Sequence, residues 1–217
     1  MSERPAAPGG VRLQSIRLPG PTGTIEGLYQ SDPEQTHPIA VLVCHPHPLH
    51  GGTLHNKVVH RAASTFVEMG AAVLRFNFRG VGESEGAHDN GRGELDDARA
   101  AWNWLGERHP NARRWVAGFS FGSWVAARLA TFEHECERMV LIAPPTTTKD
   151  FSVLDRSPVP KHVVQGTADD LCPAPALELA FAKWAEPKRV VWVPGATHFF
   201  DKQLGELANA LREVLAA

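Results

Sequence analysis

The sequence predicts an α/β fold, a mostly parallel central sheet with helices on both faces, and three observations lead to it. Short apolar runs of strand type alternate with longer segments of helical periodicity, an order typical of parallel sheets. Residues 39–44 are apolar without interruption, as expected of a strand that helices cover on both faces. The chain has 217 residues, of which 43% are hydrophobic, and this suffices for one compact domain with a large core.

The start of the chain is predicted to be a flexible tail over residues 1–10, followed by a single domain over residues 11–217. Residues 11–18 and 24–29 alternate loosely between apolar and polar side chains around a turn of Pro, Gly and Thr. This pattern predicts a hairpin that begins the sheet. Residues 32–38 are mostly polar and contain two prolines, which predicts a loop.

The remaining elements alternate along the chain. Strands are predicted at residues 39–44, 71–78, 137–143, 161–165 and 189–193, most of which are rich in apolar side chains. Helices are predicted where apolar side chains recur three or four residues apart, at residues 56–69, 94–108, 173–185 and 204–215. Residues 114–132 are expected to form a strand and then a helix. Because only the short irregular segment 146–160 separates two of the strands, we expect a minimal cap over the site or none.

The centre of the predicted site is the segment Gly118-Phe119-Ser120-Phe121-Gly122, where a strand turns into a helix. A nucleophilic serine must stand clear of the sheet, so the chain reverses sharply, and only small residues on both sides let strand and helix pass closely. We therefore predict that Ser120 is the nucleophile. The N–H of Phe121, at the start of the helix, is predicted to be the first oxyanion donor. The alternative is a glycine turn that arises by chance.

A nucleophilic serine needs a base within hydrogen-bond reach, and the base needs an orienting carboxylate. Three histidines follow Ser120 in the chain. His134 and His162 are expected on the wrong side of the sheet, whereas His198 follows the end of a strand. Because the working groups of such sheets lie beyond the carboxyl ends of the strands, His198 is predicted to be the base. A structural loop histidine is the alternative for this residue.

The orienting acid is expected after the strand that ends at Gln165, where both Asp169 and Asp170 occur. We favour Asp169 as the acid and expect Asp170 to face solvent or to act as a cap. The resulting chain order of serine, acid and histidine is the order expected for this type of sheet.

A second oxyanion donor is expected from the loop that follows residues 39–44. Pro46 and Pro48 have no N–H, so His47 is the one of these three positions that can donate. We therefore predict that the backbone N–H of His47 binds the oxyanion. The two prolines should stiffen the loop and so preorganise the donor.

Four motifs resemble the α/β-hydrolase superfamily, and most closely its small bacterial serine hydrolases without a cap. They are a His-Pro-His-Pro-x-x-Gly-Gly loop at residues 45–52, Asn-Phe-Arg-Gly-x-Gly-x-Ser at 77–84, Gly-Thr-Ala-Asp at 166–169 and the Gly-to-His loop at 195–198. The resemblance covers nearly the whole chain.

This resemblance implies a triad of Ser120, Asp169 and His198, together with ester-type acyl transfer to water. It does not supply a substrate, because many relatives have only a general hydrolase assignment. Dienelactone hydrolases share the architecture but are usually marked by a cysteine nucleophile. Their activity is therefore not expected of a chain with Ser120 at that position.

We predict a serine hydrolase that cleaves carboxylic esters of small soluble acyl substrates through an acyl-enzyme. A thioesterase or an amidase that uses the same residues is the runner-up. Two alternatives belong to other classes, a non-catalytic interaction protein on a hydrolase fold and a metal-binding protein. The metal hypothesis comes from a histidine series, His45, His47, His50, His55 and His60. Because H-E-x-x-H is absent and prolines constrain the loop, we expect no metal and no cofactor.

Composition and charge indicate the expected partners and compartment. The net charge of −2 gives no electrostatic reason for binding nucleic acid or an anionic membrane, so we expect a small-molecule acyl substrate as the partner. Three scattered cysteines without a C-x-x-C pair favour a reducing compartment. The N-terminus has no apolar core of a signal peptide, and no stretch is apolar enough to span a bilayer, so the cytoplasm is expected. The sequence makes no prediction of oligomeric state.

Overall fold

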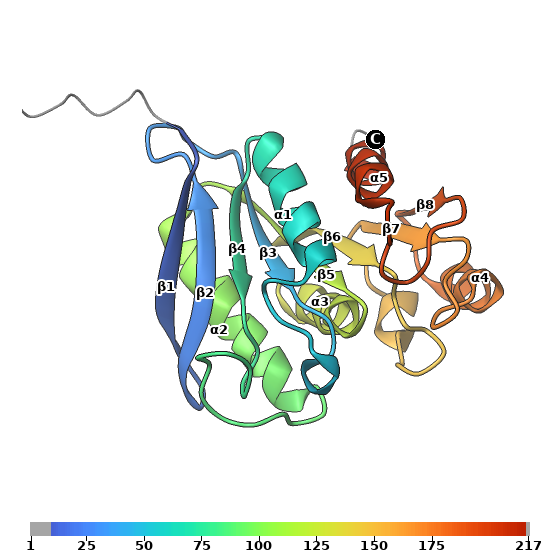
Figure 1. Cartoon of the computed structure of the whole chain (residues 1–217), viewed down its shortest axis with the longest axis horizontal. Coiled ribbons are helices and arrows are strands. Elements are labelled where there is room, and N and C mark those ends of the chain that lie inside the picture. The colour runs from blue at the N-terminus through green and yellow to red at the C-terminus, as the bar shows by residue number, and fades with distance from the viewer. Residues whose placement is uncertain (1–9, 216–217) are drawn as a thin grey trace, which may run out of the picture.

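The computed structural model describes residues 10–215, and within them eight strands form one sheet in the order β1-β2-β4-β3-β5-β6-β7-β8 (Figure 1). The predicted hairpin is present as β1 (Arg12–Gly20) and β2 (Gly23–Ser31), and β2 also runs antiparallel to β4 (Ala72–Phe76). The other neighbouring pairs are parallel, which confirms the predicted mostly parallel sheet. The tail predicted over residues 1–10 falls, but for its last residue, outside the described part of the chain.

The other elements lie within two residues of their predicted bounds. The strands are β3 (Ile39–Cys44), β5 (Arg113–Phe119), β6 (Cys136–Ile142), β7 (Lys161–Gly166) and β8 (Lys188–Val193). The helices are α1 (Lys57–Glu68), α2 (Arg92–Arg108), α3 (Phe121–Phe132), α4 (Ala174–Lys183) and α5 (Leu204–Leu215). Two short 3-10 helices, η1 (Pro48–His50) and η2 (Ser152–Asp155), were not predicted.

Helices cover both faces of the sheet, as predicted (Figure 1). One apolar core lies between the sheet and helices α2, α3 and α4, and a second lies between the sheet and helices α1 and α5. The central strand β3 contributes to both cores, because Leu42 joins the first while Val41 and Val43 join the second. This alternation explains why β3 carries no polar position, since neither of its faces contacts water.

The carboxyl ends of the parallel strands meet at one edge of the sheet, so the loops that follow β3, β5, β6, β7 and β8 lie close together there. The segment between β6 and β7 crosses this edge, and η2 is its one element of regular structure. This agrees with the prediction of a minimal cap. The edge is therefore left open above the loop that carries Ser120.

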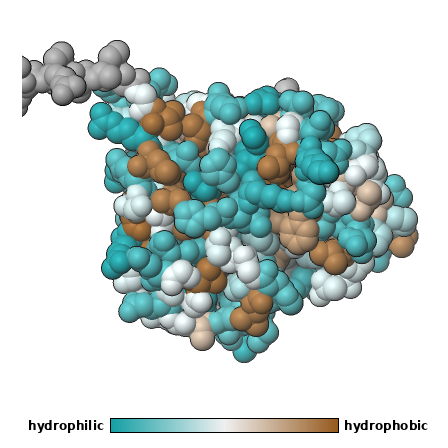
Figure 2. Space-filling model, in the orientation of Figure 1, coloured by the Kyte–Doolittle hydropathy of each residue, from teal (hydrophilic) through white to brown (hydrophobic). Residues whose placement is uncertain are grey.

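The surface view in Figure 2 shows hydrophobic residues scattered among hydrophilic ones over one face of the molecule. Such scattered apolar side chains are ordinary on a folded domain. Across residues 10–215, the helices are either too short or too polar to cross a lipid bilayer.

Candidate active site

Ser120 stands at a sharp turn between β5 and α3, in a backbone conformation that ordinary residues avoid. Its φ and ψ are 52° and −121°, and its N–H donates to the carbonyl of Ile142 at 2.9 Å. The flanking glycines make this turn possible. A Cβ on Gly118 would lie 2.1 Å from the carbonyl oxygen of Gly122, and a Cβ on Gly122 would lie 2.3 Å from that of Cys44. The turn that carries Ser120 thus packs tightly against the end of β3, and it holds the serine away from the sheet.

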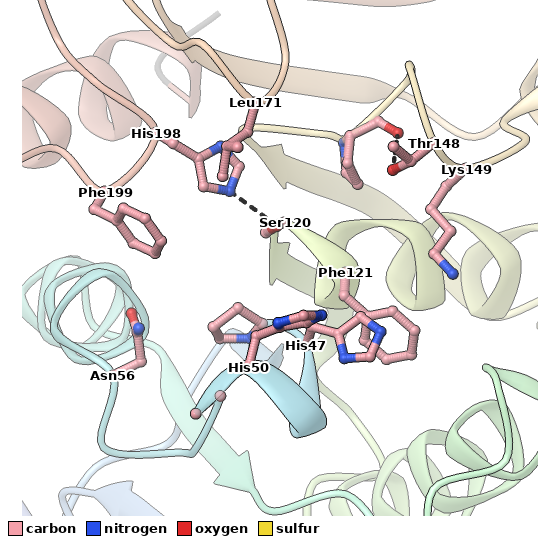
Figure 3. Close-up of a pocket in the computed structure, with 14 residues that line it drawn as sticks. His47, His50, Asn56, Ser120, Phe121, Thr148, Lys149, Leu171, His198 and Phe199 are labelled. Carbon is pink, nitrogen blue, oxygen red and sulfur yellow. Dashed lines mark hydrogen bonds between the residues drawn. The ribbon is translucent and has the colours of Figure 1, made fainter.

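Three loops bring an alcohol, an imidazole and a carboxylate into one hydrogen-bonded row. His198 Nε2 lies 2.9 Å from Ser120 Oγ, and His198 Nδ1 lies 2.8 Å from Asp169 Oδ2 (Figure 3 shows the first of these bonds). Because a carboxylate can only accept, Nδ1 carries the proton and Nε2 is left to accept from the serine hydroxyl. This is the tautomer that a general base requires. Asp169 and His198 are both buried, whereas Ser120 is partly exposed.

The loop after β7, called the acid loop below, binds the carboxylate of Asp169 at both oxygen atoms. Asp169 Oδ1 accepts from the backbone N–H groups of Leu171 at 3.0 Å and Cys172 at 2.8 Å. Asp169 Oδ2 accepts from the side-chain amide of Gln165 at 2.9 Å as well as from His198. The neighbouring Asp170 is exposed and takes no part in the row. The structure therefore brings Asp169 to the imidazole, and the catalytic role of the row stays a prediction.

Gln165 was missed by the sequence analysis. It lies in β7, is fully buried, and donates to the carbonyl of Cys172 at 2.9 Å in addition to Asp169. The signal was a polar side chain near the carboxyl end of a strand, four residues before the acid. A buried amide needs hydrogen-bond partners, and here the partners are the acid and its own loop.

The two predicted oxyanion donors lie beside the serine. Phe121 is the first residue of α3, and the ring centroids of Phe121 and His47 are 4.9 Å apart. Both residues line the same pocket as Ser120 and His198. The amide of Phe121 thus stands at a helix N-terminus, where the backbone favours negative charge. Their binding of an oxyanion remains a prediction.

The loop that carries His47 is held by the buried ring of His45. His45 Nδ1 donates to the carbonyl of Pro46 at 2.6 Å, and His45 Nε2 accepts from the N–H of Phe78 at 3.0 Å. Burial lowers the pKa of His45 to about 4, which keeps the ring neutral so that one nitrogen can donate and the other accept. His45 therefore ties the loop after β3 to the loop after β4.

The segment after β4 is fixed by its own polar side chains. Arg79 forms a two-pronged ion pair with Asp97 of α2, with Nε to Oδ2 at 3.0 Å and Nη2 to Oδ1 at 2.8 Å. Asn77 accepts from the N–H of Leu54 at 2.8 Å and donates to Glu26 at 2.7 Å. These contacts hold the 77–84 motif in place, and none of its residues is among the described residues that line the pocket.

A pocket of about 260 Å³ opens over the row. Its lining residues come from the loops after β3, β5, β6, β7 and β8 and from the start of α1: Pro46, His47, His50, Gly51, Gly52, Asn56, Ser120, Phe121, Pro145, Thr148, Lys149, Leu171, His198 and Phe199. Over the described part of the chain, no group of three or more His, Cys, Asp or Glu side chains is arranged to hold a metal ion.

Comparisons with known proteins identify the relatives of this chain. The family model described as "Serine aminopeptidase, S33" matches residues 41–156, more than half of the chain. A protein of Rickettsia prowazekii that is named as uncharacterised is 39% identical over 212 residues, which cover 94% of this chain and 89% of that protein.

Two solved structures are similar over nearly the whole length of both chains. An α/β serine hydrolase without a lid from Xanthomonas campestris is 36% identical with a TM-score of 0.88, and 94% of each chain is covered. An α/β serine hydrolase homologue from Coxiella burnetii is 35% identical with a TM-score of 0.88, and covers 93% of this chain and 97% of its own.

Proposed function

Because the chain belongs to the family described as serine aminopeptidase S33, within the α/β hydrolases, we propose that this hydrolase cleaves carboxylic esters of small acyl substrates. The observation that carries the proposal is the position of His198, whose two ring nitrogens contact Ser120 and Asp169 at 2.9 and 2.8 Å. Such a row activates the hydroxyl and stabilises the imidazolium that forms. Similarity to a lidless serine hydrolase supports placing the chain among the small bacterial enzymes marked by the His-Pro-His-Pro loop.

In the proposed reaction, Ser120 Oγ attacks the carbonyl carbon of the ester while His198 Nε2 takes the hydroxyl proton. Asp169 keeps the imidazole in position and stabilises its charged form. The tetrahedral intermediate collapses when His198 returns this proton to the leaving alcohol. An acyl group then remains on Ser120.

Water completes the cycle. His198 accepts a proton from a water molecule, which attacks the acyl carbon and forms a second tetrahedral intermediate. Collapse of this intermediate releases the carboxylic acid and returns the proton from His198 to Ser120. The open rim supports entry of water and of small substrates, because the segment between β6 and β7 adds only η2 above the site.

The N–H groups of Phe121 and His47 are the proposed oxyanion donors in both steps. One donor of this kind typically accounts for about 3 kcal/mol of the barrier. The support for His47 is the tether through His45, which fixes the loop at two points and would hold the donor in place.

Ester hydrolysis fits the pocket better than removal of an amino-terminal residue from a peptide. An aminopeptidase must bind the α-ammonium group of its substrate, and carboxylates are the usual partners of such a cation. The described residues that line the pocket include no Asp or Glu, while they do include Lys149. A cationic substrate group would thus be repelled.

A thioesterase or an amidase remains the second candidate, because the same residues could expel a thiol or an amine. The family description gives specific support for the amide, since it refers to peptide cleavage. Kinetics on matched ester, thioester and amide substrates with one acyl group would separate the three. The ester proposal requires the highest kcat/KM for the ester after correction for intrinsic reactivity.

The test of the proposed function is a panel of p-nitrophenyl esters of increasing acyl length, measured on wild type and on Ser120→Ala and His198→Ala. We expect turnover of short esters by the wild type and a fall in kcat on the order of 10⁴-fold or more in both variants. A fluorophosphonate probe should label the wild type but not Ser120→Ala. Ser15→Ala is the matched control, because Ser15 is an exposed hydroxyl on β1. Wild-type turnover in either active-site variant would disprove that residue's role.

We further propose that the protein acts in the cytoplasm on a small molecule, with residues 11–217 as one domain and no nucleic acid or membrane partner. Support for a reducing compartment comes from Cys44, Cys136 and Cys172, which are buried free thiols. Localisation of a tagged chain in fractionated cells would test the compartment.

A further inference from the structure

The pocket beside Ser120 contains a cation that forms no ion pair with a carboxylate of residues 10–215. Lys149 lines the pocket and is the single lysine or arginine among its described lining residues. None of the ion pairs formed within residues 10–215 involves its ammonium group. A half-buried charge of this kind, next to a reacting group, calls for an anionic partner from outside the chain.

Aromatic rings hold this ammonium group in place. Lys149 Nζ lies 5.4 Å from the ring centroid of Phe121 and 4.8 Å from that of Trp124. The Trp124 ring is itself anchored, because its Nε1 donates to the carbonyl of Asp150 at 2.8 Å. Attraction to ring faces orients an ammonium group without occupying its N–H donors, so these stay available to oxygen atoms of a ligand.

Other imidazole rings lie beside the ring of His47 in this part of the pocket. The ring centroids of His47 and His50 are 4.6 Å apart, and that of His88 is 4.9 Å from His47. Burial, and next the positive charge that His50, His88 and Lys149 can carry, lower the pKa of His47 to about 4. Its ring is therefore neutral at neutral pH. Because His47 Nδ1 accepts from the N–H of Leu49 at 3.2 Å, Nε2 carries the proton and can donate.

On the side of Ser120 away from Lys149, the pocket presents two large apolar side chains, with Asn56 as a polar neighbour. Figure 3 shows Phe199 and Lys149 on opposite sides of Ser120, with Leu171 beside His198. Leu171 and Phe199 are 53% and 43% exposed, so an apolar group of a substrate could cover them. A substrate bound across the serine would thus meet apolar side chains at one end and a cation with N–H donors at the other.

We propose that the substrate is an ester with a carboxylate on the side of the scissile bond that faces Lys149, and a small apolar group on the other side. Lys149 binds this carboxylate, and the imidazoles of His47 and His50 border it. The inference rests on the proposed ester hydrolysis and adds the class of substrate to it. It also explains why Lys149 forms no ion pair within residues 10–215, in a pocket whose described lining residues include no Asp or Glu.

Two substrate pairs test the proposal, one for each place where the charge can reside. For the acyl side, the pair is the mono-4-nitrophenyl ester of adipic acid and its neutral adipamide analogue. For the alcohol side, the pair is the acetate ester of 4-hydroxybenzoate and that of 4-hydroxybenzamide. In one of the pairs we expect wild-type kcat/KM to favour the anionic ester by roughly tenfold, the lower end for a hydrogen bond to a charged group. This preference should fall with added salt, which screens a half-exposed ion pair.

Variants of Lys149 identify the source of the preference. Lys149→Met should abolish the preference for the anionic ester, and Lys149→Arg should restore most of it. Arg128→Met is the matched control, because Arg128 lies 4.9 Å from the same Trp124 ring but outside the pocket lining, and its loss changes the net charge equally. That variant should keep the wild-type preference.

The outcomes separate this inference from the proposed function. Turnover of both members of each pair at equal kcat/KM would refute the substrate class and leave ester hydrolysis standing. A preference that survives in Lys149→Met, or that disappears equally in Arg128→Met, would refute the assignment to Lys149. Failure to turn over any of the four esters would refute the proposed function and the inference with it.

Discussion

The substitution Asp169→Asn tests the row most sharply, because the structure predicts which way the new amide would face. The two oxygen atoms of Asp169 have different partners. Oδ1 accepts from two backbone N–H groups, of Leu171 and Cys172, whereas Oδ2 accepts from Gln165 and His198. An asparagine has one oxygen to offer, so it can satisfy only one of these sets.

The asparagine oxygen should turn toward the backbone. The N–H groups of Leu171 and Cys172 are fixed donors at 3.0 and 2.8 Å, while the imidazole of His198 can move its proton to the other nitrogen. The new NH₂ group would then face His198 Nδ1, which must become an acceptor. The proton would reside on Nε2, and Nε2 could no longer take the proton of Ser120.

The expected result is a fall in kcat of about 10⁴-fold, as for a triad locked in the wrong tautomer, or about 5 kcal/mol of barrier. The assay is turnover of a short p-nitrophenyl ester, with circular dichroism and thermal unfolding to show that the variant folds. Asp170→Asn is the control, because Asp170 is exposed and lies outside the row. If folded Asp169→Asn kept kcat within tenfold of the wild type, Asp169 would not set the tautomer of His198.

Two further predictions concern the scaffold. Gly122→Ala should destabilise the fold by about 1–3 kcal/mol in urea unfolding, because the new Cβ would lie 2.3 Å from the carbonyl oxygen of Cys44. Gly205→Ala, whose Cβ meets nothing within 4 Å in α5, should instead stabilise by about 0.5–1 kcal/mol; equal effects of the two would contradict the packing argument. Burial lowers the pKa of Lys161 to about 8 from the ordinary 10.5, so the folded state binds fewer protons than the unfolded state between these values. The free energy of unfolding of the wild type, relative to that of Lys161→Met, should therefore rise with pH across this window. If the difference between the two proteins stayed constant, the lowered pKa of Lys161 would be refuted.

The sequence predicted the elements that depend on local pattern. The sharp turn at Ser120 was predictable, because such a turn between strand and helix requires small residues at fixed positions on both sides of the serine. The backbone angles of Ser120 confirm the turn. The strand predicted at residues 71–78 begins one residue before β4 and ends two residues after it, because large hydrophobic side chains continue to Phe78 on both sides of Asn77. The structure ends the strand earlier, since the N–H of Phe78 donates to the ring of His45 and leaves the ladder.

Features that depend on contacts distant in sequence were not predictable. The start of helix α2, two residues before the predicted one, is a local exception, because the carboxylate of Glu94 accepts the N–H groups of Asp89 and Gly91 just ahead of it. Gln165 looked like one polar residue in a strand until the fold placed it against Asp169. Lys149 lies in a segment with no periodicity, so nothing local indicated that its side chain reaches the pocket.

Direct contacts join the acid loop to the segment that carries Lys149. A substitution in that segment can therefore disturb Asp169. Cys172 Sγ donates to the carbonyl of Pro144 at 2.6 Å, and Thr147 Oγ1 donates to the carbonyl of Leu171 at 3.1 Å. The N–H of Cys172 is also one of the two that hold Asp169. Changes in residues 144–147 would therefore be transmitted to the acid and would lower activity on every substrate.

Lys149 differs from these neighbours, because its ammonium group lies over the rings of Phe121 and Trp124 and its side chain lines the pocket. Removing that charge leaves intact the hydrogen bonds that join the segment to the loop of Asp169. A selective effect of Lys149→Met on anionic esters would thus report on substrate charge. A uniform loss on neutral and anionic esters would instead show that the segment acts through Asp169, and Lys149 would then be a structural residue of the rim.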